Sequence, residues 1–215
     1  MAFRNDLVNV AKAEWDFFDR DEAGEDHTIG KVKKEAYGKY NRRVADYWKA
    51  IPEKQYKRLK DRYATRQTEI DGTTPLAWSA AFISYCMKKA GAESHFPYSS
   101  GHATWIHASI RNRKKKKMDA DLVGFRPGEL PLEVGDIVGY WRGKTKTSYD
   151  QAATKGWFES HSDIVVAVDK AKRVAYTIGG NVSQSVARKK LAISAKGALV
   201  DPPSKCIVHI KNNIE

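Results

Sequence analysis

Apolar residues recur at three- and four-residue spacing through most of the first half of the chain, which is the pattern of amphipathic helices. The pattern predicts helices over residues 3–20, 31–50, 79–90 and 102–114, with an exposed helix or ordered loop over the highly charged stretch 53–70. Pro52 follows the second of these helices and Gly91 follows the 79–90 helix, and both residue types end helices.

After Pro131 the pattern changes to short runs rich in β-branched residues and separated by turn residues, which is typical of strands. We expect strands over residues 136–141, 163–169, 173–178 and 205–210. Helices that precede a set of antiparallel strands predict an α+β fold. Residues 1–68 are predicted to be an N-terminal helical extension packed on a core of residues 69–215.

Charge and composition narrow the class of protein. The 215 residues are 41% hydrophobic, as in a folded globular protein, and carry a net charge of +12. Such a charge favours polyanionic surroundings, but no nucleic-acid-binding motif accompanies it, so we expect no nucleic-acid partner. No apolar run is long enough to span a bilayer, so we expect no membrane insertion. Residues 1–6 lack a signal-peptide pattern, so the protein is expected to be made in the cytoplasm without a cleaved leader.

Ser79 stands where the 79–90 helix begins, and two roles are open to it. A helix N-terminus carries unpaired N–H groups and a partial positive charge, which stabilise a developing anion. A serine hydroxyl is a weak nucleophile, however, and attacks only when an adjacent base removes its proton. The alternative role is helix capping, for which serine is a favoured residue.

His161 is the predicted base, because it precedes a buried strand that would hold its ring still. If residues 169–172 form a hairpin turn, His161 lies opposite Gly180 or Asn181 on the next strand. The Asn181 amide would then orient the imidazole, as the third member of a catalytic triad does. Asp163 is the competing orienting residue, since it shares a strand face with His161.

Histidines, cysteines and a glutamate elsewhere in the chain are further candidates for functional roles. His102 follows a turn-like segment and either caps a helix, binds substrate or serves as a second acid or base. Cys86 lies on the apolar stripe of the 79–90 helix, where a thiol is buried and inert. The six histidines and two cysteines show no metal-binding spacing, so neither a metal nor another cofactor is expected. Glu159, beside His161, leaves a glycosidase with paired carboxylates as an alternative.

Five segments resemble the NlpC- and CHAP-type peptidoglycan amidases and endopeptidases, and they lie within residues 70–210. The first is Trp78-Ser79-Ala80-Ala81-Phe82-Ile83, which resembles the Trp-Cys-Ala-Ala-Phe-Val stretch of that group with serine in place of cysteine. The others are 96–104, 134–138, 161–166 and 178–183. The resemblance implies a papain-like α+β core, with Ser79, His161 and Asn181 as catalytic residues and with Trp78, Ser100, His102 and Asp163 as substrate-binding residues.

The function that the resemblance implies is hydrolysis of peptidoglycan, at an amide bond of the peptide stem. The alternatives are a cell-wall-binding module that has lost catalysis through the change from cysteine to serine, and a lysozyme-like glycosidase. Without a leader, the expected settings are an antibacterial effector or a phage lysis protein, delivered to the periplasm or cell wall of a target bacterium. An effector would have an immunity protein and a component of a secretion apparatus as partners.

Overall fold

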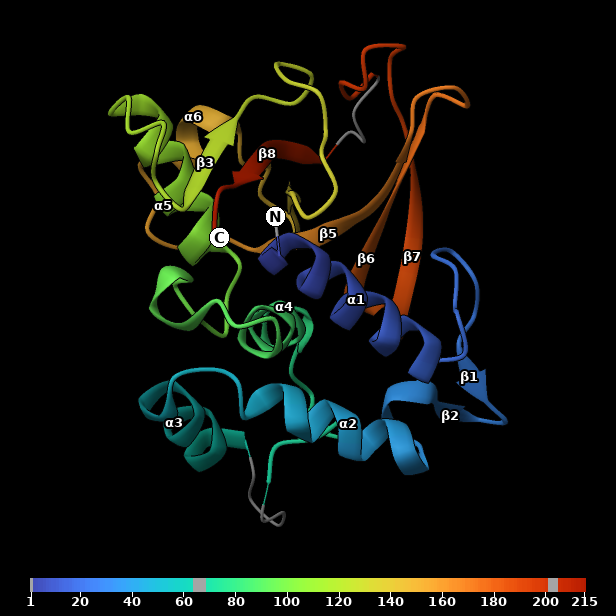
Figure 1. The fold of residues 1–215 in the computed structure, drawn as a ribbon. Coiled ribbons are helices and arrows are strands. Elements are labelled where there is room, and N and C mark those ends of the chain that lie inside the picture. Colours follow the sequence, from blue (N-terminus) through green and yellow to red (C-terminus); the bar gives the residue numbers. More distant parts are fainter. Residues whose placement is uncertain (1, 64–68, 201–204) are drawn as a thin grey trace.

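A computed structural model describes residues 2–63, 69–200 and 205–215. The helices are α1 (Ala2–Phe17), α2 (Gly38–Trp48), α3 (Glu53–Tyr63), α4 (Ser79–Lys89), α5 (Ala103–Lys114) and α6 (Tyr149–Ala152). The strands of the main sheet are β3 (Leu122–Phe125), β4 (Ile137–Trp141), β5 (Ser160–Asp169), β6 (Val174–Val182), β7 (Ser185–Ala192) and β8 (Cys206–Asn212). Helices α1 to α5 therefore precede the antiparallel main sheet, α6 lies between β4 and β5, and the predicted α+β class is confirmed (Figure 1).

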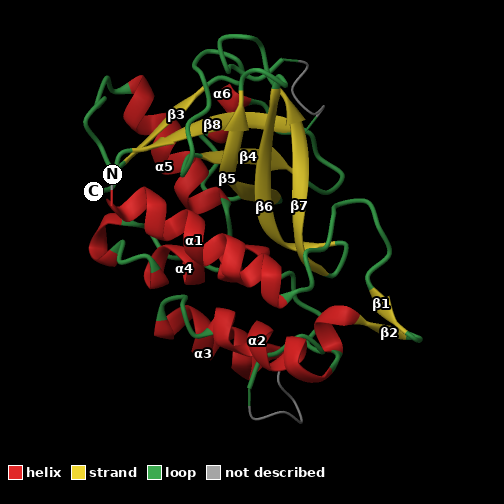
Figure 2. Cartoon of the chain, turned by 45° about the vertical axis from the view of Figure 1, so that its right-hand side comes forward, coloured by secondary structure: helices red, strands yellow, loops and turns green. Residues whose placement is uncertain are grey.

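The main sheet has six strands in the order β3-β8-β4-β5-β6-β7, and a small separate hairpin pairs β1 (Thr28–Ile29) with β2 (Val32–Lys33). Figure 2 shows α1 and α4 lying against the sheet, with α2 and α3 farther from it. Helix α5 packs beside β3 and β8 at the other end of the sheet. Among the described helices, none combines the length and the apolar character that a bilayer crossing requires.

The two faces of β5 pack against different parts of the molecule, because successive side chains of a strand point to opposite faces. Ile164 belongs to the large core that the sheet shares with α1, α4 and α5. Its neighbour Val165 belongs to a smaller core on the far face, together with Val138 and Tyr140. Even-numbered residues at the start of β5 therefore face the helices, and odd-numbered residues face away from them.

The N-terminal helices hold the residue that precedes α4. The Trp78 ring stacks on Tyr47 of α2 at a centroid distance of 5.5 Å and on Phe18 at 6.1 Å. Its indole N–H donates to the Glu35 carboxylate at 2.8 Å. Aromatic stacking and the hydrogen bond of the indole N–H therefore hold the start of α4 in place.

Several predicted elements are confirmed, and two are wrong in part. The helix expected over 3–20 ends at Phe17, since Asp19 and Arg20 both take a φ of 62°. Helices α4 and α5 begin and end within one residue of the predicted ranges, and all four predicted strands form. The helix expected over 31–50 is reduced to Gly38–Trp48, preceded by β2 and a single 3₁₀ turn at Lys34–Ala36. Buried Lys34 explains this difference, because its ammonium binds the Phe18 carbonyl and the Asp21 carboxylate, which holds the segment against the end of α1.

Strands β3 and β7 were not predicted. Both are edge strands of the sheet. Three consecutive cations, at 188–190, interrupt the apolar pattern of β7, and charged residues are a common protection of sheet edges. The boundary predicted between residues 68 and 69 adjoins segment 64–68, which is outside the described residues. Side chains from both sides of it, such as Leu7 and Phe82, lie in one core, and the division into two parts stays a prediction.

Candidate functional site

Ser79 is the first residue of α4, and its hydroxyl does not cap the helix. The N-cap position is Trp78, which makes no side-chain capping bond. The Ser79 Oγ instead lies 2.7 Å from Nε2 of His102, a hydrogen-bond distance. The capping role is therefore wrong for Ser79, and its hydroxyl is bound to a potential base.

His102 lies immediately before α5, and both of its ring nitrogens are hydrogen-bonded to serines. Its Nδ1 lies 2.8 Å from the Ser162 Oγ, on the face of β5 that is turned to the helices. The Trp105 indole N–H donates to the same Ser162 Oγ at 3.0 Å. Since an indole only donates, Ser162 accepts this bond, and its hydroxyl has one lone pair and one proton left for Nδ1 of His102, with the direction set by the tautomer of the imidazole. The imidazole is therefore held in line between Ser79 and Ser162.

A second polar group is formed by the odd-numbered residues of β5. Nε2 of His161 lies 2.7 Å from the Asp163 Oδ1, and the Lys189 ammonium donates to Oδ2 of the same carboxylate at 2.8 Å. The Nδ1 of His161 is buried and has no hydrogen-bond partner among the described residues. The His161 and His102 rings are neighbours, with centroids 5.2 Å apart.

Burial sets the charge state of these groups. It holds the pKa of His102 well below the ordinary value, and the neighbouring His161 adds to the effect. Burial also lowers the pKa of His161 to about 4, although Asp163 acts in the opposite direction. For Asp163, burial works to raise the pKa, but Lys189 and His161 outweigh it and the pKa is well below its usual range. At neutral pH the site therefore holds two neutral imidazoles and one carboxylate ion.

Two cavities open onto these groups. The first, of about 390 Å³, is lined by Ser79 and His102, and Trp157 on its wall is 73% exposed. The second, of about 810 Å³, reaches His161 and Lys189. Arg142 and Gly143, directly after β4, line both cavities, so the two adjoin at the end of that strand.

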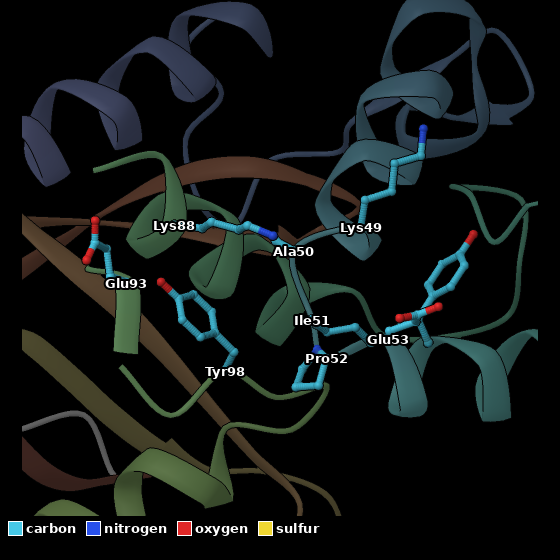
Figure 3. Close-up of a pocket in the computed structure, with 9 residues that line it drawn as sticks. Lys49, Ala50, Ile51, Pro52, Glu53, Lys88, Glu93 and Tyr98 are labelled. Atoms are coloured by element: carbon cyan, nitrogen blue, oxygen red, sulfur yellow. The ribbon is translucent and has the colours of Figure 1, made fainter. Parts of the chain in front are cut away.

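A separate cavity of about 590 Å³ lies at the α2–α3 connection, away from these residues. Its wall carries two lysines and two glutamates, and Figure 3 shows Tyr98 beside Lys88 and Glu93. None of the residues that line it is a serine, cysteine or histidine. The described residues also include no cluster of histidine, cysteine and carboxylate groups that could hold a metal ion. The Ser79 cavity is therefore the candidate active site.

The structure corrects three of the predicted site residues. The Asn181 amide donates to Glu35 at 2.7 Å rather than to His161, because Asn181 leaves the strand conformation with φ of 55°. Trp78 is 1% exposed and is not among the residues that line the Ser79 cavity. Asp163 is fully buried and lines neither cavity, and it is Asp163, rather than Asn181, that is hydrogen-bonded to the His161 ring.

The predicted pairing of Ser79 with His161 is also wrong. Odd-numbered His161 points to the face of the sheet away from α4, whereas Ser162 points toward it, and the hydrogen bond of Ser79 is to His102. Ser100 and His102 line the Ser79 cavity as expected. Cys86 is confirmed as buried, and burial raises the pKa of its thiol well above the usual range.

Four contributors were not predicted: Trp105, Arg142, Ser162 and Lys189. Ser162 lies in segment 161–166. Because side chains alternate between the two faces of a strand, the sequence pattern would have placed Ser162 on the opposite face from His161 and Asp163. Arg142 and Lys189 are brought in by elements remote in sequence from Ser79 and His102, whereas Trp105 lies three residues after His102, on α5.

Comparison with known proteins places the chain in a family. A family model described as an uncharacterised protein conserved in bacteria, DUF2272, matches residues 35–212. The chain belongs to this family. The matched region contains every residue of the Ser79–His102 and His161–Asp163 groups, and also Glu35, on which Trp78 and Asn181 converge. No curated protein and no solved structure matches the chain.

The buried histidines predict a pH-dependent stability in this member of the DUF2272 family. The unfolded chain protonates its histidines near pH 6.5, whereas folded His161 does so only near pH 4. Between these values the unfolded state binds more protons, so the free energy of unfolding falls as the pH is lowered from 6.5 to 4. His161 alone would account for roughly 2–3 kcal/mol.

Urea denaturation between pH 7.5 and 4.5 measures this loss. His161→Gln is expected to show a smaller decline than the parent protein, whereas His95→Gln, at an exposed position, keeps the full decline. A free energy of unfolding that stays constant over this range would contradict the assignment of a buried neutral imidazole at His161.

Gly179 makes room for the His161–Asp163 pair. A Cβ atom at this position would lie 1.9 Å from the Asp163 Oδ1 and 3.1 Å from the His161 Nε2. Gly179→Ala therefore forces the carboxylate off its partners, and overpacking of this kind lowers the free energy of unfolding by about 1–3 kcal/mol. Thermal or chemical denaturation tests this, with Gly156→Ala as control, since a Cβ at Gly156 meets nothing within 4 Å.

Proposed function

We propose that this protein is a serine-dependent hydrolase that cleaves an amide bond in the peptide stem of peptidoglycan. The observation that carries the proposal is the 2.7 Å contact between the Ser79 Oγ and the His102 Nε2, at the start of a helix and on the wall of a cavity. A hydroxyl bound to a neutral imidazole is the arrangement that nucleophilic acyl transfer requires.

The reaction follows from this geometry. Ser79 Oγ attacks the substrate carbonyl carbon while its proton passes to Nε2 of His102, and the carbonyl oxygen becomes an oxyanion. As the carbon–nitrogen bond breaks, His102 returns the proton to the departing amine and an acyl-serine ester remains. Water then attacks the ester with His102 again as base, which releases the acid and regenerates Ser79.

Neighbouring groups stabilise the two charges that develop in this reaction, the negative charge of the oxyanion and the positive charge of the His102 imidazolium. The first helical bond of α4 runs from the Phe82 N–H to the Trp78 carbonyl, so the N–H groups of residues 79–81 precede it and are available to an oxyanion at the helix start. The proposed mechanism uses the tautomer of His102 that carries its proton on Nδ1, where the Ser162 Oγ accepts it, so that Nε2 accepts the Ser79 proton. Ser162 and Trp105 are positioning residues, since they act through His102.

The choice of a cell-wall peptide as substrate rests on the resemblance of residues 70–210 to NlpC- and CHAP-type enzymes and on the net charge of +12. A papain-like core is proposed on the same ground, with a helix that carries the nucleophile packed on an antiparallel sheet. Peptide stems carry carboxylates, which a basic protein attracts. Delivery as an antibacterial effector, with an immunity partner, or as a phage lysis protein remains the proposed setting.

The cavity favours acyl transfer over glycoside cleavage. Glycosidases use two carboxyl groups that flank the scissile bond. Among the residues that line the Ser79 cavity, Glu159 is the one carboxylate. A serine–histidine pair with a single carboxylate matches hydrolysis of an amide.

Incubation of the purified protein with peptidoglycan sacculi, followed by mass spectrometry of the soluble fragments, tests the proposal. We expect fragments with new amino groups from the wild-type protein and none from Ser79→Ala. New reducing sugars would instead identify a glycosidase. Sedimentation of the protein with intact sacculi, without release of fragments, would identify a binding module and overturn the hydrolase proposal.

A further inference from the structure

The cavity that adjoins the Ser79 site is strongly basic. Five cationic side chains line its 810 Å³, and Glu22 is the one carboxylate among its lining residues. The cations are Arg142, Arg188, Lys189, Lys190 and Lys205. Concave surfaces lined by one sign of charge concentrate oppositely charged ligands.

Two of these cations are already neutralised within the protein. Arg188 forms an ion pair with Glu22 at 2.6 Å, and Lys189 pairs with buried Asp163 at 2.8 Å. Arg142, Lys190 and Lys205 form no ion pair with a described residue. The cavity therefore keeps an excess of positive charge after its internal pairs are counted.

Arg142 is the most informative of the three, because it lines both cavities and is partly buried. Burial lowers the pKa of its guanidinium, against the effect of Asp163, yet the group stays charged. Its backbone is fixed by the bond from its own N–H to the Glu159 carbonyl at 2.7 Å. A guanidinium that has lost part of its hydration and pairs with no carboxylate among the described residues is suited to a carboxylate supplied by a ligand.

We propose that Arg142 binds a carboxylate of the substrate next to the bond that Ser79 cleaves, and that Lys190 and Lys205 extend this subsite to further acidic groups. The inference rests on the proposed function and narrows it to substrates with an acidic residue beside the scissile amide. An extended peptide would pass from the Ser79 cavity around the end of β4, where Arg142 joins the two cavities, into the basic one. The planar guanidinium gives this subsite a two-point contact that a lysine does not provide.

Equilibrium binding tests the subsite without hydrolysis. The probes are N-acetylated tetraglutamate and tetraglutamine, titrated calorimetrically into Ser79→Ala protein. We expect the glutamate peptide to bind at least about tenfold more tightly, and Arg142→Gln to weaken it about tenfold. Arg142→Lys should lie between the two. Arg111→Gln is the matched control, because it removes the same charge from an exposed position on α5 and should leave the affinity unchanged.

Two results would overturn the proposal: equal affinity for the two peptides, or an Arg142→Gln variant that binds tetraglutamate like the parent. A third probe, pyrophosphate, separates carboxylate from phosphate recognition. If Arg142→Gln weakens pyrophosphate binding alone, the site is a phosphate site and the carboxylate proposal fails. Failure of the proposed hydrolase appears in a different measurement, as wild-type protein that releases nothing from sacculi.

Discussion

Ser79→Ala is expected to lower the rate of amide cleavage about a thousandfold or more, and His102→Ala is expected to do the same. In the proposed mechanism the hydroxyl is the attacking group and the imidazole is its base, so removal of either abolishes the covalent route. Because the two act as a unit, the double variant should lose little more than either single variant. Initial rates of fragment release from sacculi, measured for all three variants, check this.

The controls for this prediction use the same substitutions at exposed positions. Ser94→Ala and His95→Ala should keep the wild-type rate. His161→Gln is the discriminating variant, because a larger loss there than in His102→Gln would make His161 the base and contradict the assignment from the structure. Full activity in Ser79→Ala would remove the basis of the serine mechanism altogether.

Asp163→Ala is expected to lower the free energy of unfolding by about 3–5 kcal/mol. The carboxylate is fully buried and binds both the His161 Nε2 and the Lys189 ammonium, so its removal leaves two polar groups without their partner. Asp163→Asn should cost less than the alanine variant, since the amide keeps the shape and one hydrogen bond but loses the charge that faces Lys189. Urea denaturation at pH 7.5 measures both changes.

The matched control is Asp169→Ala, at the other end of the same strand. Its side chain is 36% exposed, and a change there should alter the free energy of unfolding by less than about 1 kcal/mol. If Asp163→Ala were as mild as Asp169→Ala, the His161–Asp163–Lys189 group would not be the stabilising feature inferred from its burial.

Features that depend on residues close together in the sequence could be predicted from the sequence alone. The stripe of Phe82 and Cys86, with Gly91 after it, marks a helix whichever way the chain folds around it, and Ser79 stands at its start. The β-branched runs mark β4, β5, β6 and β8 in the same way. The order of these local signals was enough for the α+β class, because helices and strands reveal themselves by their periods of 3.6 and 2.

The partners in the site were decided by tertiary structure. Ser79 is bound to His102 rather than His161 because the alternation of β5 turns Ser162 toward the helices and His161 away from them. The Asn181 amide is hydrogen-bonded to Glu35, which lies 146 residues earlier in the chain, rather than to His161. The sequence by itself determined the helix that carries Ser79 and the strand that faces it. Which side chains meet there was settled only by the packing of the whole chain, because contacts between remote segments depend on which face each element presents.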